Sequence, residues 1–157
     1  MNRAIYPGTF DPITVGHTDI VRRASKLFDG VVVAVAQSRG KRPMFDHETR
    51  VEMARRALHS MKNVEVVGFD TLLVELSERL EADIVVRGLR AVSDFEYELQ
   101  MGYANSSMKS DLETVYLMPS LEYAFVSSSV VRSILEFGGR VEHLLPPEIL
   151  PMIEAVG

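Results

Sequence analysis

Residues 31–36, Val-Val-Val-Ala-Val-Ala, decide the fold of this chain. All of them are β-branched or small and apolar, a composition typical of a β-strand that is buried on both faces of a parallel sheet. Before this strand, Thr18–Phe28 carries apolar residues at helical spacing, and Arg3–Tyr6 is a short strand candidate. Because a helix between two strands joins parallel neighbours by a right-handed crossover, this segment predicts a βαβ unit.

The same alternation of helix and strand continues to the end of the chain. Asp46 is a good N-cap for the next helix, and Pro147 suits the first turn of the last one. We predict an α/β fold class: a single domain over residues 1–157, with a Rossmann-like, doubly wound, parallel five-stranded sheet and C-terminal helices. Beyond the first βαβ unit, the expected helices cover residues 46–60, 72–80, 94–108, 128–137 and 147–156, and the expected strands cover 64–67, 84–86 and 114–118.

Composition and charge exclude several classes of protein. The chain has 157 residues and a net charge of −5, whereas a dedicated nucleic-acid binder usually carries a basic surface, so we expect no nucleic acid among its partners. The lack of cysteines excludes disulfides, thiolate zinc sites and a cysteine nucleophile. No secretory signal precedes the first strand and no apolar stretch is long enough to span a bilayer, so we expect a cytoplasmic protein with no membrane partner.

Basic and polar side chains gather in the loops that follow the predicted strands. Ligands of doubly wound sheets bind beyond the carboxyl ends of the strands, so these loops should share one site. In a chain with net negative charge, this concentration of cations predicts a bound polyphosphate. The cations and serines are His17 in loop 6–17, then Arg39, Lys41 and Arg42, then Arg87 and Arg90, and finally the three serines at 127–129.

The first of these loops, Tyr-Pro-Gly-Thr-Phe-Asp-Pro-Ile-Thr-Val-Gly-His over residues 6–17, has the features of a phosphate-binding turn. Gly8 allows the backbone to approach a ligand closely. Gly16 and His17 open a helix, where free N–H groups and the helix dipole favour an anion. His17 could donate a hydrogen bond to a phosphoryl oxygen there, or it could merely cap the helix.

Three blocks of sequence carry a resemblance to a known family. Loop 6–17, with its Thr-x-Gly-His ending, resembles the signature of the nucleotidylyltransferase superfamily, which shares this ending with class I aminoacyl-tRNA synthetases. Residues 87–90 (Arg-Gly-Leu-Arg) with 94–98 (Asp-Phe-Glu-Tyr-Glu), and residues 127–132 (Ser-Ser-Ser-x-x-Arg), resemble the bacterial phosphopantetheine adenylyltransferase family in particular. The first block alone is moderately specific, but all three in this order are highly specific, and the resemblance runs from about residue 3 to residue 146.

Membership of that family implies a reaction. The adenylyl group of ATP would pass reversibly to 4′-phosphopantetheine, giving dephospho-CoA and pyrophosphate, by direct attack of the acceptor phosphate on the α-phosphorus. Such chemistry needs alignment and charge stabilisation more than a protein nucleophile or base. The family also implies Mg²⁺ held mainly by ATP phosphates and water rather than by protein ligands, feedback inhibition by coenzyme A, and a homohexamer.

The resemblance also implies a role for each matching residue. As catalytic residues it implies His17, Lys41 and Thr9, with His17 stabilising the α-phosphoryl oxygens. As acceptor-binding residues it implies Thr9, Lys41, Leu73 and Arg87. Two positions depart from the family pattern, because Val126 stands where Ile is usual and Tyr123 where many members have Trp. As ATP-binding residues it implies Thr9, Phe10, His17, Gly88, Leu89, Arg90, Glu98, Tyr123, Ala124, Phe125, Val126, Ser127, Ser128 and Ser129.

Plainer interpretations of the same residues stay open at this point. Arg87 could be the partner of a surface ion pair, and Lys41 with Arg42 could be a solvated loop. Glu98 could lie on a solvated helix face, and Leu73 could be ordinary core. The serines at 127–129 could form a plain N-cap, and capping can coexist with binding.

Two other functions compete with the family reaction. The first is a sister transferase with another acceptor, such as a nicotinamide mononucleotide adenylyltransferase or a glycerol-phosphate cytidylyltransferase, against which residues 87–98 speak. The second is a non-catalytic nucleotide-binding module, against which stands the full set of charged positions that the family expects. The absence of a Gly-x-Gly-x-x-Gly or P-loop motif disfavours other nucleotide-binding folds.

Overall fold

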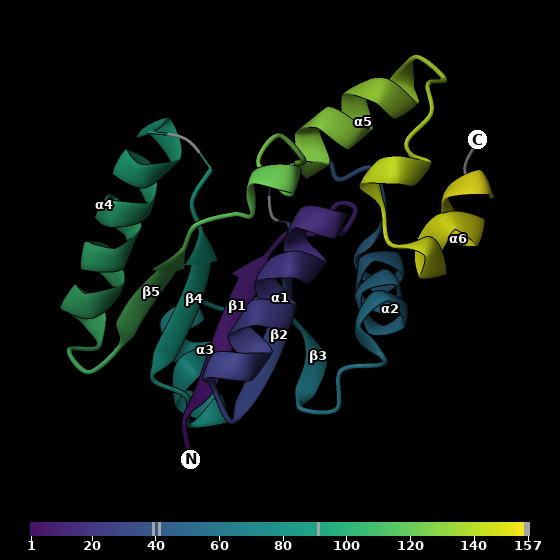
Figure 1. Ribbon diagram of the computed structural model, residues 1–157. Coiled ribbons are helices and arrows are strands. Elements are labelled where there is room, and N and C mark those ends of the chain that lie inside the picture. The colour runs from purple at the N-terminus through teal and green to yellow at the C-terminus, as the bar shows by residue number, and fades with distance from the viewer. Residues whose placement is uncertain (39, 41, 91, 156–157) are drawn as a thin grey trace.

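A computed structural model describes residues 1–38, 40, 42–90 and 92–155. Within these ranges the chain forms a five-stranded parallel sheet with the strand order β3-β2-β1-β4-β5 (Figure 1). This arrangement confirms the predicted α/β, doubly wound fold. The strands are β1 (Arg3–Gly8), β2 (Gly30–Ala36), β3 (Val64–Phe69), β4 (Ile84–Gly88) and β5 (Glu113–Leu117).

Helices cover both faces of this sheet. Figure 1 shows α1 crossing in front of the strands and α3 behind them. The larger buried cluster joins α1 and α2 to the sheet, whereas two smaller clusters seat α3 on the opposite face. The α-helices are α1 (Val15–Leu27), α2 (His47–Leu58), α3 (Leu73–Leu80), α4 (Val92–Met108), α5 (Ser128–Glu136) and α6 (Leu150–Glu154), and the short 3-10 turns are η1 (Leu121–Tyr123), η2 (Glu142–Leu144) and η3 (Pro147–Ile149).

The first and the last helix differ most from the sequence prediction. The first helix begins at Val15 rather than Thr18, because Thr14 is its N-cap and accepts a hydrogen bond from the backbone N–H of His17. The last helix does not run unbroken from Pro147: a 3-10 turn precedes α6, since Pro151 has no N–H to donate one turn back. The predicted cap at Asp46 is confirmed, since its carboxylate accepts from the N–H of Thr49 at 2.8 Å.

The sheet opens between β1 and β4, where the strand order reverses. The parallel register of β1 with β2 extends along all of β1, from Arg3 to Gly8, but its register with β4 covers only Ala4 and Ile5. Beyond that point the Nη1 of Arg87 on β4 donates to the carbonyl of Pro7, 2.7 Å away. Beyond Ile5, a hydrogen bond from the Arg87 side chain thus takes the place of backbone hydrogen bonds between β1 and β4. The two strands separate here and leave a crevice at the carboxyl edge of the sheet, where such sheets bind ligands.

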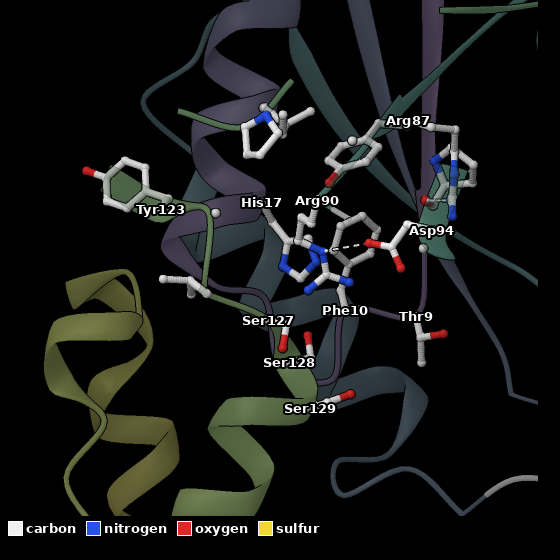
Figure 2. Close-up of a pocket in the computed structure, with 18 of the residues that line it drawn as sticks. Thr9, Phe10, His17, Arg87, Arg90, Asp94, Tyr123, Ser127, Ser128 and Ser129 are labelled. Carbon is white, nitrogen blue, oxygen red and sulfur yellow. Dashed lines mark hydrogen bonds and ion pairs between the residues drawn. The ribbon is translucent and has the colours of Figure 1, made fainter. Parts of the chain in front are cut away.

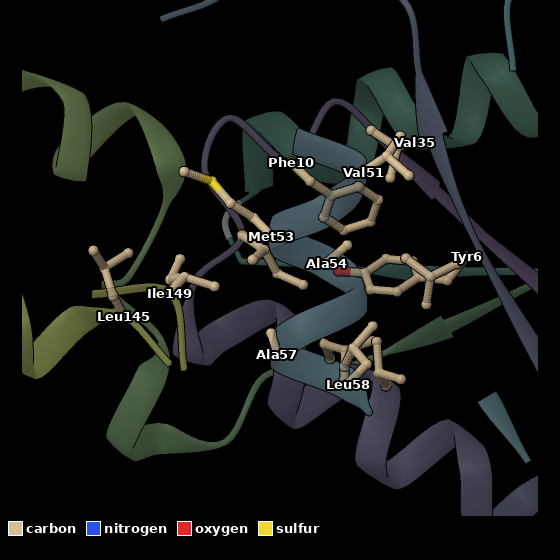
Figure 3. Close-up of a cluster of buried hydrophobic side chains, with 14 of the residues drawn as sticks. Tyr6, Phe10, Val35, Val51, Met53, Ala54, Ala57, Leu58, Leu145 and Ile149 are labelled. Carbon is tan, nitrogen blue, oxygen red and sulfur yellow. The ribbon is translucent and has the colours of Figure 1, made fainter. Parts of the chain in front are cut away.

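The larger core cluster holds the C-terminal segment against the rest of the chain. Figure 3 shows Met53 and Ala54 of α2 between Tyr6 and Phe10 on one side and Leu145 and Ile149 on the other. This packing places the end of the chain beside α2, so that α5 lies over the carboxyl edge of the sheet (Figure 1). Among the described residues, no helix combines the length and the apolar character needed to cross a membrane.

Candidate active site

A cavity of about 250 Å³ lies at the carboxyl edge of the sheet and is walled by all three sequence blocks (Figure 2). The structure therefore brings His17, Arg90 and the serines at 127–129 around one space, although they are far apart in the sequence. We call this space the first cavity. Its lining residues are Tyr6 to Phe10, Gly16, His17, Ile20, Arg87, Gly88, Arg90, Asp94, Glu98, Pro119, Tyr123 and Val126 to Ser129.

A second cavity, of about 290 Å³, adjoins the first. The two share the wall formed by residues 7–9 together with Arg87 and Glu98. Away from that wall the second cavity is mainly apolar, so it suits a longer, less charged ligand than the first. Its remaining lining residues are Ala36, Phe69, Leu73, Val85, Tyr97, Met101, Gly102, Asn105 and Thr114.

His17 both caps α1 and keeps a free donor. Its Nδ1 accepts a hydrogen bond from the backbone N–H of Thr14 at 2.9 Å, which completes a capping box with the Thr14 side chain. Because Nδ1 is an acceptor, the proton of the neutral ring lies on Nε2. Burial, with the positive charges of Arg90 and Arg87, lowers the pKa of His17 to about 3. At neutral pH the ring is therefore an uncharged hydrogen-bond donor.

Phe10 supports that imidazole from one side. Its ring meets the ring of His17 edge-on, with centroids 4.9 Å apart, and Phe10 itself is buried with a positive φ of 49°. A Cβ on Gly8 would come within 3.0 Å of the Phe10 ring. The glycine at this position thus makes room for Phe10, a reason that the sequence did not reveal.

Arg87 and Glu98 form a bidentate ion pair in the wall between the cavities. The guanidinium Nε and Nη2 donate to the two carboxylate oxygens at 2.8 and 2.6 Å. Glu98 is buried, with 8% of its surface exposed, and Arg87 is half-buried. Arg87 is therefore an ion-pair partner, as the plainer interpretation held, but the pair is not an open surface one. The expectation that Glu98 lies on a solvated helix face is wrong, because its carboxylate is buried between α4 and β4.

The serine run surrounds the N-terminus of α5. Ser127 is the N-cap and accepts from the N–H of Val130 at 3.2 Å, so the capping interpretation is confirmed. The hydroxyl of Ser128 donates to the carbonyl of Pro12 at 2.8 Å, which ties this helix start to the first loop. Ser129 accepts from Arg132 at 3.2 Å, so its own hydroxyl hydrogen stays free to donate to a ligand. A helix N-terminus with spare N–H groups is a ready anion site.

Several predicted residues lie elsewhere or outside the described ranges. Leu73 lies on the wall of the second cavity, not in the first. Leu89, Ala124 and Phe125 line neither cavity, and Phe125 is 63% exposed. Lys41, together with Arg39, falls outside the described residues.

Arg50 and Asp11 are two buried charged residues that the sequence analysis missed. Arg50, only 1% exposed, donates to the carbonyls of Thr9, Ala36 and Phe45. The carboxylate of Asp11 accepts from the N–H groups of Met44 and Phe45 at 2.8 and 2.9 Å. Together they join the loop after β1 to the end of the loop after β2. A signal existed in the sequence, since Arg50 occupies the apolar stripe of α2 one turn before Ala54 and two turns before Leu58.

Comparisons with known proteins point to one family. The family model for cytidylyltransferase-like proteins matches residues 5–134. A curated phosphopantetheine adenylyltransferase from Campylobacter concisus is 59% identical over 151 residues, covering 96% of this chain and 97% of the relative. Its counterpart from Campylobacter hominis is 57% identical over 150 residues, covering 96% and 94%. The one from Nautilia profundicola is 57% identical over 148 residues, covering 94% and 96%.

Solved structures share the fold. One from Vibrio parahaemolyticus, provisionally described as a nicotinate-nucleotide adenylyltransferase, has a TM-score of 0.73 at 18% identity and covers 98% of this chain and 99% of that one. At this identity the likeness shows the fold alone. The family model covers most of the residues and the curated relatives align with nearly all of them, so the chain belongs to the phosphopantetheine adenylyltransferases, which are enzymes of the cytidylyltransferase-like group of nucleotidyltransferases.

Proposed function

We propose that this enzyme transfers the adenylyl group of ATP to 4′-phosphopantetheine, giving dephospho-CoA and pyrophosphate, as a step of coenzyme A biosynthesis. The names of the relatives support this reaction. The observation that carries it is the pair of adjoining cavities, which share Thr9, Arg87 and Glu98. One cavity has the donors for a triphosphate, and the other has the apolar lining for an extended arm.

The triphosphate of ATP would occupy the first cavity. The Nε2–H of His17 would donate to an α-phosphoryl oxygen, and Arg90 would add positive charge beside it. Ser128 and Ser129, with the backbone N–H groups at the start of α5, would bind the β- and γ-phosphates. The remaining nucleotide contacts that we propose are Thr9, Phe10, Gly88, Tyr123, Val126 and Ser127 from the cavity wall, with Leu89, Ala124 and Phe125 in the adjacent backbone.

The acceptor would enter through the second cavity. Its phosphate would lie at the shared wall, held by Arg87 and Thr9, and Lys41 is the further acceptor-binding residue that the family resemblance implies. The pantetheine arm would extend along Leu73, Phe69 and Met101. This places the attacking phosphate next to the α-phosphate of ATP, as a direct transfer requires.

The chemistry would rest on positioning and charge stabilisation. A phosphate monoester is already an anion at neutral pH, so no side chain has to remove a proton from it. An uncharged His17 can strengthen its hydrogen bond as negative charge develops on the α-phosphoryl oxygens, without itself exchanging a proton. One phosphoanhydride bond would break and another would form, so the transfer would be close to thermoneutral and reversible, and the same contacts would serve the reverse reaction.

Mg²⁺ would accompany the triphosphate and offset part of its negative charge. In the first cavity, Asp94 and Glu98 are each paired with an arginine. Nor is any cluster of three or more histidine, cysteine, aspartate or glutamate side chains in the described ranges placed to hold a metal ion. These residues fit an ion held mainly by phosphate oxygens and water.

Self-association also belongs to the proposal. Phe95, Leu99 and Tyr103, each one turn after the last on α4, leave 45%, 37% and 70% of their surfaces exposed. An exposed apolar stripe of this kind marks an interaction surface. We expect it to contribute to the interfaces of a homohexamer, as the family implies.

Coenzyme A carries both an adenylate and a pantetheine arm, so feedback inhibition would arise from its fit to both cavities. The cytoplasmic location stays a prediction.

Pyrophosphate release tests the reaction directly. The enzyme is given ATP or CTP together with 4′-phosphopantetheine, nicotinamide mononucleotide or glycerol 3-phosphate, and mixtures without enzyme serve as the blank. We expect pyrophosphate release only from the pair of ATP and 4′-phosphopantetheine, and from none of the other combinations. Faster turnover with CTP, or with another acceptor, would assign the chain to one of the sister transferases. Nucleotide binding with no transfer to any acceptor would favour a binding module.

A further inference from the structure

One buried carboxylate close to the site, that of Asp19 on α1, has no role in the chemistry proposed above. Its side chain is 4% exposed, and it lines neither cavity. Its neighbours on the same helix, His17 and Ile20, do line the first cavity. Burying a carboxylate is costly unless charged or polar groups surround it, so the partners of Asp19 are informative.

Asp19 accepts hydrogen bonds from its own helix and from a distant segment. Its Oδ1 accepts from Arg22, and its Oδ2 lies 3.5 Å from Nη1 of Arg23. The hydroxyl of Ser120 donates to the same Oδ2 at 2.7 Å, although Ser120 is 101 positions away along the chain. Because both arginines belong to α1, Ser120 is the contact that joins Asp19 to another segment.

This distant segment is the one that leaves β5, and we call residues 118–126 the exit segment. Nη1 of Arg23 donates to the carbonyl of Met118 at 2.6 Å, so residues 118 and 120 are both held on α1. Pro119, which lies between them, lines the first cavity. Figure 1 shows the chain passing from β5 by the start of α1 to η1 and α5.

The position of Ser120 is passed on along the exit segment. Ser120 is the N-cap residue of η1, but its side chain makes no capping hydrogen bond there and donates to Asp19 instead. Its carbonyl accepts from the N–H of Tyr123 at 2.9 Å, and the carbonyl of Tyr123 accepts from the N–H of Val126 at 3.0 Å. Val126 meets α1 again at Gly16, where a Cβ would lie 3.3 Å from the Val126 carbonyl oxygen. The exit segment is therefore seated on α1 at both ends.

The part of the first cavity that the exit segment walls suits a nucleoside. Ile20, Pro119 and Tyr123 line the first cavity and not the second, and their side chains are apolar or aromatic. The serine end of the cavity has its own anchor, because the hydroxyl of Ser128 donates to the carbonyl of Pro12. A displaced exit segment should therefore impair the fit of a base and ribose more than that of the outer phosphates.

We propose that Asp19 is a positioning residue for the nucleotide, which acts through Ser120 and, with Arg23, holds the exit segment as the nucleoside wall of the first cavity. Asp19 itself contacts neither substrate. The proposal rests on the function proposed above and adds to it a network that lies behind the cavity wall.

Steady-state kinetics of pyrophosphate release, with each substrate varied in turn, test this role. Ser120→Ala removes the hydroxyl and leaves Asp19 with its two arginines. We expect it to raise the KM for ATP about fivefold and to change the KM for 4′-phosphopantetheine less than about twofold, since the lost hydrogen bond supports the first cavity alone. Ser120→Thr keeps the hydroxyl and should restore the KM for ATP. Ser25→Ala, which removes a hydroxyl bonded to the Arg22 carbonyl within α1, is the matched control and should leave both constants unchanged.

The reverse reaction distinguishes the nucleoside from the phosphates. Dephospho-CoA carries the nucleoside, whereas pyrophosphate would bind at the serine end. Ser120→Ala should therefore raise the KM for dephospho-CoA about fivefold and spare the KM for pyrophosphate. An equal rise for pyrophosphate would mean that the whole cavity is loosened, and it would overturn the proposal.

A double-mutant cycle tests whether the serine acts through Asp19. Asp19→Asn keeps the size but not the charge, and in that background Ser120→Ala should add less than about twofold to the KM for ATP. A full fivefold further increase would show that Ser120 acts without Asp19, against the proposal. If Asp19→Asn does not fold, Arg23→Gln removes the donor to Met118 instead, and it should raise the KM for ATP about threefold without affecting the acceptor.

The unmodified enzyme is assayed first, so that the two proposals can fail separately. If it prefers another acceptor, the proposed function fails, and the same comparison made with that acceptor still decides the role of Asp19. If it turns over as proposed but Ser120→Ala and Arg23→Gln leave the KM for ATP unchanged, only the present inference is refuted.

Discussion

Replacing Arg50 by lysine should lower the free energy of unfolding by about 3 kcal/mol, although the charge is kept. Arg50 is 1% exposed and donates three hydrogen bonds, at 2.9, 2.7 and 2.7 Å, to the carbonyls of Phe45, Thr9 and Ala36. Hydrogen bonds from a charged group contribute about 1.5–3 kcal/mol each. A single ammonium group cannot reach three carbonyls that a planar fork spans, so we expect two of the bonds to be lost.

The same substitution should also slow the reaction, because two of those carbonyls belong to the strand ends that carry the site. Thr9 lines both cavities, and a displacement of about 1 Å at a reacting group can cost roughly a hundredfold in rate. The loss of stability and the fall in kcat should therefore appear together in Arg50→Lys.

Thermal and urea unfolding, followed by circular dichroism at one fixed protein concentration, measure the stability change. For a chain of this size, 3 kcal/mol corresponds to a fall of roughly 6–12 °C in the melting midpoint. Arg55→Lys is the matched control, because Arg55 is exposed on the same helix. If Arg50→Lys stays within about 0.5 kcal/mol of the unmodified protein, as exposed substitutions usually do, the buried network does not carry the energy assigned to it.

Four further predictions concern the site, its pH dependence and the assembly. His17→Ala should lower kcat by about a hundredfold to a thousandfold while calorimetry shows unchanged ATP affinity, and unaltered turnover would remove His17 from the mechanism. The folded-state pKa of His17 is lowered to about 3, so between pH 6.5 and 3 the unfolded chain binds a proton that the folded chain does not. The free energy of unfolding should therefore fall as the pH drops through that window, and it should fall less steeply in His17→Asn. Parallel urea titrations at several pH values would show whether the two slopes differ. Lys41→Ala should raise the KM for 4′-phosphopantetheine more than that for ATP, and equal increases would contradict its acceptor role. Leu99→Glu should reduce the mass measured by light scattering, and an unchanged mass would place the interface away from that stripe of α4.

Local patterns predicted the elements and the general position of the site. The apolar run at 31–36 and the cap at Asp46 are read from neighbouring residues, and both appear in the structure as expected. The convergence of the loops follows from a rule about parallel sheets, so residues as distant as His17 and Ser129 could be assigned to one cavity. The start of α1 was misplaced because a threonine at position 14 reads equally well as loop and as cap.

Partnerships between distant residues could not be predicted in this way. Nothing local to Arg87 shows that its guanidinium faces Glu98, because the pairing depends on how α4 lies beside β4. Likewise, the apolar stripe of α2 indicates that Arg50 is buried, but it does not indicate that Arg50 binds the carbonyl of Thr9, 41 positions earlier. Gly8 illustrates the same limit, because the ring of Phe10 occupies the space that a Cβ at this position would need.

The sequence by itself determined the order of strands and helices, the doubly wound sheet and the family, because hydrophobic periodicity, capping residues and motif spacing are properties of the chain alone. Only the tertiary structure decided which charges are paired, that one wall separates two cavities, and that His17 is an uncharged donor. The physical reason is that hydrogen bonding, burial and electrostatic shifts depend on distances between atoms, and folding sets those distances for residues that the sequence keeps far apart.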